Sequence, residues 1–487
     1  DPVRYDSSMK IVGSRWVLKQ KTADTVRARL VAQEFSDGVK HDELFASTPS
    51  LASFRAFMAI AASLLKDHGG YTLSCHDVAT AVLHADIKSP VYIRPPPEYI
   101  KLHNLDPSCV LRLRKALYGT RQAARCWQDH LKAVLSDYHL SPLKSEPCMY
   151  SNQDKTMFVL VHVDDLLVCA TDSERLRFTK FLASRVTLND SHVLSKPNDS
   201  LEYLSKRIVM TQCGFTVQSD FDGKLVESLK DLLSLQNCKG VTTPGTTPGK
   251  DEGGDEDVLL NPVQHNVYRR AVGIALWLSH DRVDIQYAVK QCCSHASSPR
   301  ESDMMRIKRL VRYLSAFPSV VMTFEADDDF KTLTVYSDSD WAGDRATRRS
   351  TSGGCVYFRS MLLNSWSKSQ HVVSLSSAEA ELYALCTAVC ELLATQHLLR
   401  EVGFGALRLS AWIDANATLQ NLSRGTSKGM RHVEIKYYFI RDLLRDNKLH
   451  LGKVDGKKNT SDLLTKFVTR DVLDTLIALM PLKMISS

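Results

Sequence analysis

The chain has 487 residues, of which 44% are hydrophobic and 24% are charged, and 62 Lys and Arg against 55 Asp and Glu give a formal net charge of +7. This length exceeds one hydrophobic core and predicts about three domains of roughly 150 residues each. The composition is that of a globular protein, and no continuous apolar run reaches the ~18 residues that a membrane span needs. The mild positive charge permits a nucleic-acid partner without requiring one.

The chain begins with Asp1-Pro2-Val3-Arg4, without an initiator Met or the apolar core of a signal peptide. We therefore expect a piece of a longer protein. Its twelve cysteines include no C-x-x-C pair, which disfavours a zinc or disulfide framework. Reduced core cysteines in an intracellular protein are predicted instead.

The first half of the chain alternates short strands with amphipathic helices. Apolar spacing predicts the following elements in chain order: strands at 16–18 and 29–32, a helix over 51–65 that ends before Gly69-Gly70, a strand that reaches Asp77, a helix-like segment at 78–83, a helix around 127–135, and two strands within 157–170. These elements indicate a mixed α/β unit over residues 1–240.

The second half contains a clear composition shift at residues 242–257, TTPGTTPGKDEGGDED, which has no apolar period. We expect a surface linker over 241–262. Helices are predicted at 271–278, 285–289 and 304–317, within a helical region over 263–330. From residue 333 the pattern is strand, hairpin near 359–360, helix, strand and helix, so a compact α/β unit is expected over 331–470, followed by a C-terminal tail over 471–487.

Two adjacent carboxylates, Asp164 and Asp165, interrupt the apolar run FVLVHVDDLLVCA at 158–170. A lone Asp pair is most often a tight turn. However, ionised carboxylates beside a core need compensation, and a divalent cation provides it. Asp77 ends a second short strand, although alone it would suit a helix N-cap. Together the three could hold a pair of Mg²⁺ ions for the transfer of a nucleotide to a primer.

Between these sites lies LRKALYGTRQAARCW at 113–127. The Tyr118-Gly119 turn is expected to open a helix on which Arg121 and Arg125 share one face, four residues apart. This face is either solvated or a surface for template and nucleotide, with Gln122 in the pocket.

A second set of carboxylates lies in the C-terminal unit. Asp338 and Asp340 are expected on one face of a strand, and Ser376 with Glu379 fits a capping box that leaves Glu381 free for chemistry. Each carboxylate alone is more often structural, and Asp462 suits a first helical turn. The four that sit on different elements suit a two-metal site for phosphodiester hydrolysis, and they are Asp338, Glu381, Asp414 and Asp462.

Several stretches, in order along nearly the whole chain, resemble the reverse transcriptase–ribonuclease H segment of copia-type (Ty1/copia) LTR retrotransposon Pol polyproteins. They are SRWVLKQ, VRARLVAQEF, HDVATAVLHADIKSPVYIRPPPEY, LRKALYGTRQAARCW, HVDDLLV, YRRAVGIALWLS, SDSDWAGDRATRRSTSGG, SWSKSQHVVSLSSAEAEL and RHVEIKYYFIRDLL. The resemblance implies an α+β right-hand polymerase with fingers, a palm built on an antiparallel sheet and a helical thumb or connection. An α/β RNase H-like domain would follow.

The resemblance also implies an RNA-directed DNA polymerase with an RNase H activity that degrades the RNA of the hybrid. Two Mg²⁺ ions per active site are expected, with Mn²⁺ as an alternative. Partners would be an RNA template, a DNA primer and product, the RNA–DNA hybrid and dNTPs, with no membrane. The location would be cytoplasmic, in a virus-like particle, or nuclear. The sequence does not indicate whether the chain dimerises.

The resemblance makes Asp77, Asp164 and Asp165 the polymerase metal ligands. It implies that Lys19 and, more firmly, Arg29 reach the incoming triphosphate.

The chain departs from the family at several positions. Val82 stands where an aromatic ring usually crowds the sugar 2′-hydroxyl, which predicts weaker discrimination against ribonucleotides. His162 replaces a Tyr and is expected to share a strand face with Asp164, near the primer end.

Two alternatives remain open. The departures favour a divergent, catalytically impaired or repurposed copy that only binds nucleic acid, whereas the seven retained carboxylates argue against it. The other alternative is a nuclease whose polymerase half is a structural platform. A basic, aromatic stretch with Lys428, Arg431, His432, Lys436 and Arg441 is either a solvated helix or a contact for the hybrid backbone.

Overall fold

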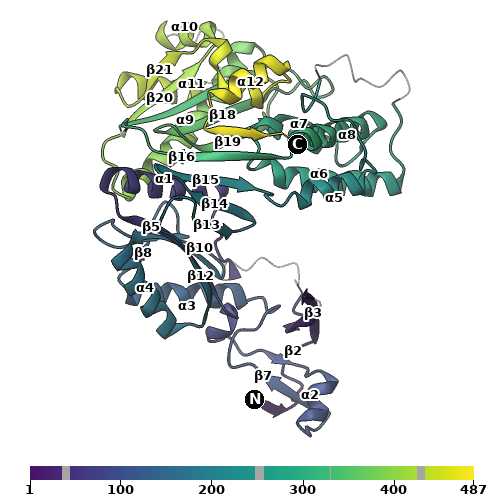
Figure 1. The fold of residues 1–487 in the computed structure, drawn as a ribbon. Coiled ribbons are helices and arrows are strands. Elements are labelled where there is room, and N and C mark those ends of the chain that lie inside the picture. The colour runs from purple at the N-terminus through teal and green to yellow at the C-terminus, as the bar shows by residue number, and fades with distance from the viewer. Residues whose placement is uncertain (23, 36–43, 247–256, 330, 425–433, 487) are drawn as a thin grey trace. The chain divides into compact units, whose positions relative to one another are not determined.

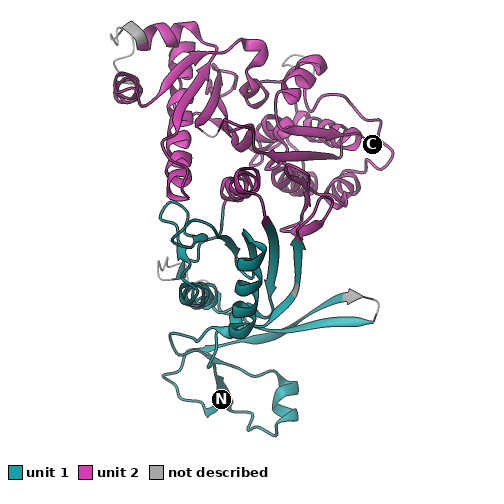
Figure 2. Ribbon diagram, turned by 60° about the vertical axis from the view of Figure 1, so that its left-hand side comes forward, with its two compact units in different colours: residues 1–49, 72–193 teal, residues 50–71, 194–487 magenta. Residues whose placement is uncertain are grey.

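The computed structural model describes residues 1–22, 24–35, 44–246, 257–329, 331–424 and 434–486. Its contacts divide the chain into two units, residues 1–49 with 72–193 and residues 50–71 with 194–487 (Figure 2). This division differs from the predicted boundaries at residues 240 and 330. Helix α1 (Leu51–His68) belongs to the second unit, because its side chains are buried against strands of that unit on several faces.

The main sheet of unit 1 has six strands in the order β12-β5-β11-β10-β9-β8. Its strands are β5 (Tyr71–Val78), β8 (Ser141–Pro142), β9 (Met149–Ser151), β10 (Phe158–His162), β11 (Asp165–Thr171) and β12 (Leu188–Leu194). Helices α3 (Ala123–Asp137) and α4 (Asp172–Arg185) contribute Trp127, Leu131 and Phe178 to the same core as Val159 and Val168. The amphipathic helix predicted around residues 127–135 is therefore confirmed as part of α3.

Unit 1 also contains two smaller sheets. One has the order β1-β7-β6-β2 and the other is the two-stranded ribbon β3–β4 (Figure 2). Their strands are β1 (Pro2–Arg4), β2 (Ile11–Val12), β3 (Ser14–Thr22), β4 (Thr25–Ala32), β6 (Tyr92–Ile93) and β7 (Cys109–Arg112), with helix α2 (Pro97–Leu102) before β7. The segment predicted as helix-like after Asp77 is a short 3₁₀ helix, η2 (Ala81–His84), because Thr80 adopts a left-handed conformation.

Unit 2 contains the antiparallel sheet β13-β14-β15-β16-β22 and a group of helices (Figure 1). The elements are β13 (Ser200–Tyr203), β14 (Lys206–Met210), β15 (Gly214–Ser219), β16 (Ser319–Glu325), β22 (Leu482–Ile485), α5 (Lys224–Leu232), α6 (Pro262–Ser279), α7 (Val283–Ser294) and α8 (Glu301–Ala316). The predicted tail is structured instead, because β22 completes this sheet by pairing with β16. Of the predicted linker, residues 247–256 lie outside the described residues.

The second sheet of unit 2 has the order β19-β18-β17-β20-β21. Its strands are β17 (Thr332–Asp340), β18 (Thr351–Phe358), β19 (Met361–Ser369), β20 (Arg408–Ile413) and β21 (His450–Lys453). The first three form an antiparallel meander, whereas β20 and β21 run parallel to β17. The predicted hairpin near residues 359–360 is confirmed, with Arg359 at a positive φ of 54°.

Helix α9 (Ser377–Glu401) packs on β17 and β18. Among the described helices it alone is long and apolar enough to cross a membrane by length and composition, but 56% of that stretch is buried inside the unit. The apolar character of α9 is therefore explained by its place as the central core helix. The remaining elements are α10 (Asn416–Arg424), α11 (Glu434–Arg445), η4 (Gly456–Lys458), η5 (Thr460–Leu464) and α12 (Arg470–Ala478).

Two candidate carboxylate centres

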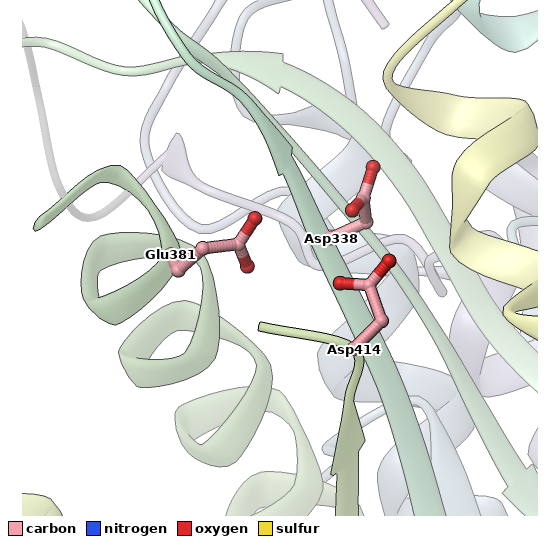
Figure 3. Close-up of side chains that lie close together, drawn as sticks. All are labelled: Asp338, Glu381 and Asp414. Atoms are coloured by element: carbon pink, nitrogen blue, oxygen red, sulfur yellow. The ribbon is translucent and has the colours of Figure 1, made fainter. Parts of the chain in front are cut away.

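Three carboxylates of unit 2 converge at one end of the second sheet. Asp338 lies on β17, Glu381 on the first turns of α9, and Asp414 directly after β20. One carboxylate oxygen of each lies within 4.8 Å of the others, and Figure 3 shows them pointing toward one another from a helix and two strands. Among the described residues, no other group of three or more His, Cys, Asp or Glu residues meets this criterion. We call these residues, with Asp462, the C-terminal centre.

Local sequence places each of these side chains. Because β17 and β20 are parallel neighbours, Asp338 near the C-terminal end of β17 and Asp414 just after β20 lie at the same end of the sheet. Ser376 caps α9 by accepting a hydrogen bond from the Glu379 N–H, while the Glu379 carboxylate accepts one from the Leu375 N–H. Glu379 therefore has a structural role, although its carboxylate bonds the N–H of Leu375 and not the Ser376 N–H of the predicted capping box, and Glu381 is left to face Asp338.

Gly353 allows the segment that carries the fourth carboxylate, Asp462, to pack close to Asp338. Gly353 pairs directly with Asp338, and a Cβ at this position would lie 2.7 Å from the Leu464 Cβ. The absence of a side chain lets η5, which carries Asp462, pack against β18. The Thr465 hydroxyl donates a hydrogen bond to Asp338 Oδ2.

Lys466 lies between two of these acids. Its Nζ is 3.0 Å from Asp462 Oδ2 and 3.7 Å from Asp338 Oδ2. The side chain is nevertheless 46% exposed, so it can move away from the carboxylates. This lysine compensates part of the negative charge in the free protein.

Burial and mutual repulsion perturb the ionisation of the centre. Burial, with the charges of Asp338 and Asp414, raises the pKa of Glu381 to about 8. Burial also raises the pKa of Asp338, against the opposing effect of Lys466. Like charges held together in a desolvated site therefore disfavour the fully ionised state.

The donor set fits divalent cations. All four side chains offer hard oxygen ligands, which Mg²⁺ prefers. Glu381 Oε2 and Asp462 Oδ1 are buried without a hydrogen-bond partner among the described residues. Buried, unsatisfied acceptors are costly unless a cation is bound.

The second set of carboxylates lies at a hairpin of unit 1. Strands β10 and β11 pair from Phe158 with Cys169 to His162 with Asp165, so Val163 and Asp164 form a two-residue turn. Val163 has a φ of +56°, an unfavourable conformation for a β-branched residue. Its carbonyl accepts a hydrogen bond of 2.6 Å from the Trp127 indole. The carboxylate pair is therefore presented at a strained tip held by the α3 core, a combination typical of functional sites.

Asp77 lies on the strand next to this hairpin. β5 neighbours β11 in the sheet, and the Val78 N–H donates a 2.9 Å hydrogen bond to the Asp164 carbonyl. The Asp77 carboxylate accepts a 2.7 Å hydrogen bond from Asn189 on β12. We call Asp77, Asp164 and Asp165 the hairpin centre.

The hairpin centre is electrostatically coupled but not closely gathered. Burial, then the charges of Asp164 and Asp77, raise the pKa of Asp165 to about 6. The three carboxylates nevertheless do not place one oxygen each within 4.8 Å of the others, as those of the C-terminal centre do. Asp165 is thus half-buried and close enough to the other two acids to feel their charge.

The β3–β4 ribbon carries both predicted triphosphate contacts. Val17 pairs with Arg29 and Lys19 pairs with Arg27, so Lys19 and Arg29 share one face. The Arg29 guanidinium lies 5.2 Å from the centre of the Tyr118 ring. Tyr118 is half-buried, and its pKa is raised by burial and also by the charge of Asp164. This ring lies close to both a predicted triphosphate contact and the hairpin centre.

A glycine fixes the ribbon to the Tyr118 turn. The Ala32 N–H donates a 2.7 Å hydrogen bond to the Tyr118 carbonyl, and a Cβ on Gly119 would lie 2.0 Å from the Ala32 carbonyl oxygen. Gly119 also has a φ of +84°. Only glycine accepts both the conformation and the close approach.

Two predicted placements need correction. The expected shared face of His162 and Asp164 is wrong, because the strand ends at His162 and Asp164 belongs to the turn; the pairing partner of His162 is Asp165. Val82 is only 5% exposed and packs in the unit 1 core. Its side chain therefore does not line an open surface in this structure.

The basic segment before α3 also differs from expectation. α3 begins at Ala123, so Arg121 precedes the helix, and its backbone N–H donates to Glu34. Arg121 and Arg125 therefore do not share one helix face. Arg125 donates to Asp129 and to the Phe45 carbonyl. The Gln122 side chain accepts hydrogen bonds from the backbone N–H groups of Lys88 and Ser89, so it fixes the chain after η2.

The predicted basic stretch is only partly described. Lys428, Arg431 and His432 lie outside the described residues. In α11 the Lys436 ammonium lies 4.6 Å from the Tyr383 ring centre, and the Arg441 guanidinium lies 4.3 Å from that of Tyr438. These two cations therefore pack on the protein's own rings.

Sequence reasoning missed several residues that contact the two centres. They are Asn189, Tyr118, Thr465 and Lys466. The last two follow Asp462 by three and four positions, a spacing that places them within a helical turn of it and was available as a signal. Asn189 carries no such signal, because it reaches Asp77 across 112 positions of sequence.

Comparison with known proteins gives one family match and several relatives. Residues 1–247 match the family described as reverse transcriptase (RNA-dependent DNA polymerase). The chain is 29% identical to the retrovirus-related Pol polyprotein from transposon RE1 of Arabidopsis thaliana, over 95% of this chain and 31% of that protein. It is 26% identical to the Pol polyprotein from transposon TNT 1-94 of Nicotiana tabacum, over 94% and 34%. It therefore spans about a third of the length of these curated relatives.

Solved structures of RNase H domains also match the chain. LC11-RNase H1 in complex with an RNA/DNA hybrid is 15% identical, with a TM-score of 0.22, over 28% of this chain and 94% of that chain. The N-terminal RNase H domain of a Mycobacterium tuberculosis protein is 14% identical, also with a TM-score of 0.22, over 30% and 96%. Likenesses at this TM-score carry no conclusion by themselves.

The family match covers half of the chain, and the relatives from retrotransposons align with nearly all of it. The chain belongs to the reverse transcriptase (RNA-dependent DNA polymerase) family, as a region of a Ty1/copia-type retrotransposon Pol polyprotein.

Proposed function

We propose that the chain is an RNA-directed DNA polymerase with an associated RNase H activity. The hairpin centre would join nucleotides to a DNA primer on an RNA template, and the C-terminal centre would cut the RNA of the resulting hybrid. The observation that carries this proposal is the convergence of Asp338, Glu381 and Asp414 within 4.8 Å, from three separate elements of one sheet-and-helix unit.

Divalent cations would be held at the C-terminal centre by its four carboxylates. When bound, a pair of Mg²⁺ ions, or Mn²⁺ in their place, would activate the attacking oxygen and stabilise charge on the phosphate. Asp338, Glu381 and Asp414, whose carboxylate oxygens lie within 4.8 Å of one another, would hold these ions together with Asp462, whose charge acts on Asp338. Thr465 would orient Asp338, since its hydroxyl already donates to that carboxylate.

At the hairpin centre, Asp77, Asp164 and Asp165 would hold the cations, with Asp164 at the turn between β10 and β11. Asn189 would orient Asp77 through its amide hydrogen bond. The raised pKa of Asp165 supports this role, because a carboxylate with perturbed ionisation in a group of acids is typical of functional sites.

The incoming dNTP would meet the β3–β4 ribbon. Lys19 and Arg29 share a face, and their positive charge suits a triphosphate. Tyr118, with Arg29 over its ring, would supply an aromatic wall that Val82 does not. The other partners would be the RNA template, the primer and the hybrid, within a cytoplasmic particle or the nucleus.

The experiment is a pair of assays on one preparation of the full chain. Primer extension on poly(rA)/oligo(dT) with Mg²⁺ or Mn²⁺ tests the polymerase, and release of fragments from a labelled RNA–DNA hybrid tests the nuclease. Both activities are expected to depend on the divalent ion. Absence of both, with the hybrid still bound, would contradict the proposal.

A second candidate is a nuclease whose polymerase half is impaired. The observation that favours it is the difference between the two centres, because only the C-terminal carboxylates are closely gathered among the described residues. Hybrid cleavage without any primer extension in either metal would select this candidate.

A further inference from the structure

A ten-residue loop, residues 341–350, joins β17 to β18 beside the C-terminal centre. Asp338 precedes the end of β17 by two residues, which places the start of the loop about 7 Å from the Asp338 Cα at 3.3 Å per residue. The loop carries Arg345, Arg348 and Arg349, and all three side chains are exposed. We call it the arginine loop.

The arginine loop has a defined internal structure. The Asp344 carboxylate accepts 3.0 Å hydrogen bonds from the N–H groups of Ala346 and Thr347. The Arg348 N–H donates a 2.7 Å bond to the Asp344 carbonyl, and the Asp344 N–H donates a 3.2 Å bond to the Arg349 carbonyl. The side chain of Asp344 is therefore used to close the turn, so the arginines are held outward on a fixed backbone.

Arg348 adopts a φ of +56°, which is unusual for a residue with a side chain. Neither Arg348 nor Arg349 forms an ion pair with another residue that the structure describes. The guanidinium groups of Arg348 and Arg349 are therefore exposed to solvent, and the backbone of Arg348 is in an unfavourable conformation. The turn closed by Asp344 holds Arg348 in this conformation and keeps both side chains directed to solvent.

The base of the loop is tied to the rest of unit 2. The Lys290 ammonium of α7 donates a 2.9 Å hydrogen bond to Thr351, the first residue of β18. The Ala342 N–H donates a 3.0 Å bond to the Ser350 hydroxyl, which closes the loop across its neck. These contacts anchor the neck of the loop to β18 and α7.

An aromatic ring accompanies the cations. Trp341 is 48% exposed at the start of the loop. Its indole N–H donates a 3.0 Å hydrogen bond to the Ser374 carbonyl, in the segment before α9. A fixed, half-exposed ring on the same loop as the arginines is a combination that suits nucleic acid, where phosphates take the charge and the ring packs on a sugar or base.

We propose that the arginine loop binds the sugar–phosphate backbone of the RNA–DNA hybrid and so positions the hybrid at the C-terminal centre. The proposal rests on the nuclease half of the proposed function. A duplex is the fitting occupant because its phosphates repeat every 3.4 Å along each strand. A duplex that reaches the carboxylates would therefore present several phosphates to a loop that begins about 7 Å away.

The same sheet offers a matched control at its other end. Arg400, Arg408 and Lys448 line a cavity of about 740 Å³. Arg408 begins β20 and Asp414 follows its end, so this group lies about 20 Å from the carboxylates at 3.3 Å per residue. Lys448 is paired with Asp446 at 3.2 Å. These cations are similar in type but are not expected to reach a duplex held at the centre.

The test compares Arg348→Ala/Arg349→Ala with Arg400→Ala/Arg408→Ala in the full chain. Hybrid affinity is measured in Ca²⁺, at several salt concentrations, so that binding is separated from cleavage. The slope of log Kd against log salt is expected to become shallower by about two units in the loop variant, one for each lost phosphate contact. The control variant should keep the wild-type slope. In Mg²⁺, the KM for hybrid cleavage should rise in the loop variant while kcat changes little.

The variant Arg348→Lys/Arg349→Lys separates charge from folding. It keeps two cations on the same backbone, so its salt slope should remain close to that of the wild type. A loop variant with the wild-type slope and KM would overturn this inference, while hybrid cleavage by the wild type would leave the proposed function standing. If the wild type does not cut the hybrid at all, the proposed nuclease fails, and the salt slopes still decide whether the loop binds the duplex.

Discussion

The two carboxylate centres use the same kinds of side chain in different surroundings. Asp338, Glu381 and Asp414 come from three elements that pack around one sheet, and they lie within 4.8 Å of one another. Asp77, Asp164 and Asp165 come from two neighbouring strands and a turn, and they are less closely gathered. The first arrangement gathers like charges at an electrostatic cost, whereas the second holds its carboxylates farther apart.

The difference follows from what surrounds each group. In the C-terminal centre Asp338, Glu381 and Asp462 are buried and Asp414 is partly buried, and Lys466 and Thr465 partly compensate Asp338. In the hairpin centre Asp77 is held by Asn189, a neutral amide that fixes its direction without adding charge. The comparison therefore predicts different responses to mutation, pH and metal at the two sites.

The largest effect is expected for Glu381→Gln. Removing one ligand charge from the C-terminal centre should lower hybrid cleavage on the order of a thousand-fold, since metal-assisted charge stabilisation contributes several kcal/mol. Primer extension should be unchanged. The matched control is Glu379→Gln, two residues away on α9, whose carboxylate accepts the Leu375 N–H. Equal loss of cleavage in both variants would remove Glu381 from the chemistry.

A pH-dependent stability effect should follow from the same residue. The folded pKa of Glu381, about 8, exceeds its ordinary value of 4.5, so the folded state binds more protons between these two values. Raising the pH through this window should therefore destabilise the metal-free protein, by on the order of 5 kcal/mol for this group alone. At pH 8.5 without metal, Glu381→Gln should unfold at a higher temperature than the wild type.

Mg²⁺ sharpens this test. The ion should raise the unfolding temperature of the wild type more at pH 8.5 than at pH 5.5, because ionised carboxylates bind it better. The Glu381→Gln variant should respond less. Identical melting of the two proteins across this pH range would mean that the C-terminal carboxylates are not strained by one another.

Replacing the groups that orient the ligands should have intermediate effects. Thr465→Val removes the hydroxyl that donates to Asp338 and should reduce cleavage roughly 10- to 100-fold, while Thr465→Ser should keep most of it.

Asn189→Ala should reduce primer extension within the same range, with recovery at higher Mg²⁺. Ser191→Ala is the control on β12, because its hydroxyl bonds His76 and no carboxylate. If higher Mg²⁺ does not restore primer extension in Asn189→Ala, Asn189 does not orient a metal ligand.

The smallest effect is expected at Tyr118. The Arg29 guanidinium lies over its ring, and loss of such a contact is worth about 0.5–2 kcal/mol, or a few-fold to roughly thirty-fold in dNTP affinity. Tyr118→Ala should therefore raise the KM for dNTPs and increase ribonucleotide incorporation, whereas Tyr118→Phe should keep the ring and most of the selectivity. An unchanged ratio of rNTP to dNTP incorporation in Tyr118→Ala would place the nucleotide elsewhere.

The sequence predicted the acidic residues better than their surroundings. Asp338 on a strand, Glu381 after a Ser376 cap and Asp164 at a hairpin are local patterns, and the structure places each on the expected element. The approach of η5 to β18 could not be predicted, because it depends on Gly353 being paired with Asp338 in the folded sheet. The register of strands far apart in the chain is a tertiary property.

The failures have similar causes. His162 was expected beside Asp164 because strand alternation was extended through a turn. Residues 471–487 were expected to form a tail. They contain β22 instead, and sequence patterns did not reveal it because its partner β16 lies more than 150 positions earlier in the chain. The contact units divide the chain elsewhere than at the predicted boundary near residue 240, because α1 packs with strands that follow it by many residues. The family match, over residues 1–247, ends close to that boundary. Each of these depends on a non-local contact that no short window of sequence contains.

The central claim is that two separate centres perform two separate reactions. The most direct measurement assays primer extension and hybrid cleavage side by side for the wild type, Asp165→Asn and Asp338→Asn. We expect Asp165→Asn to lose extension and keep cleavage, and Asp338→Asn to lose cleavage and keep extension. Loss of both activities in either variant, or of neither in both, would contradict the assignment of one reaction to each centre.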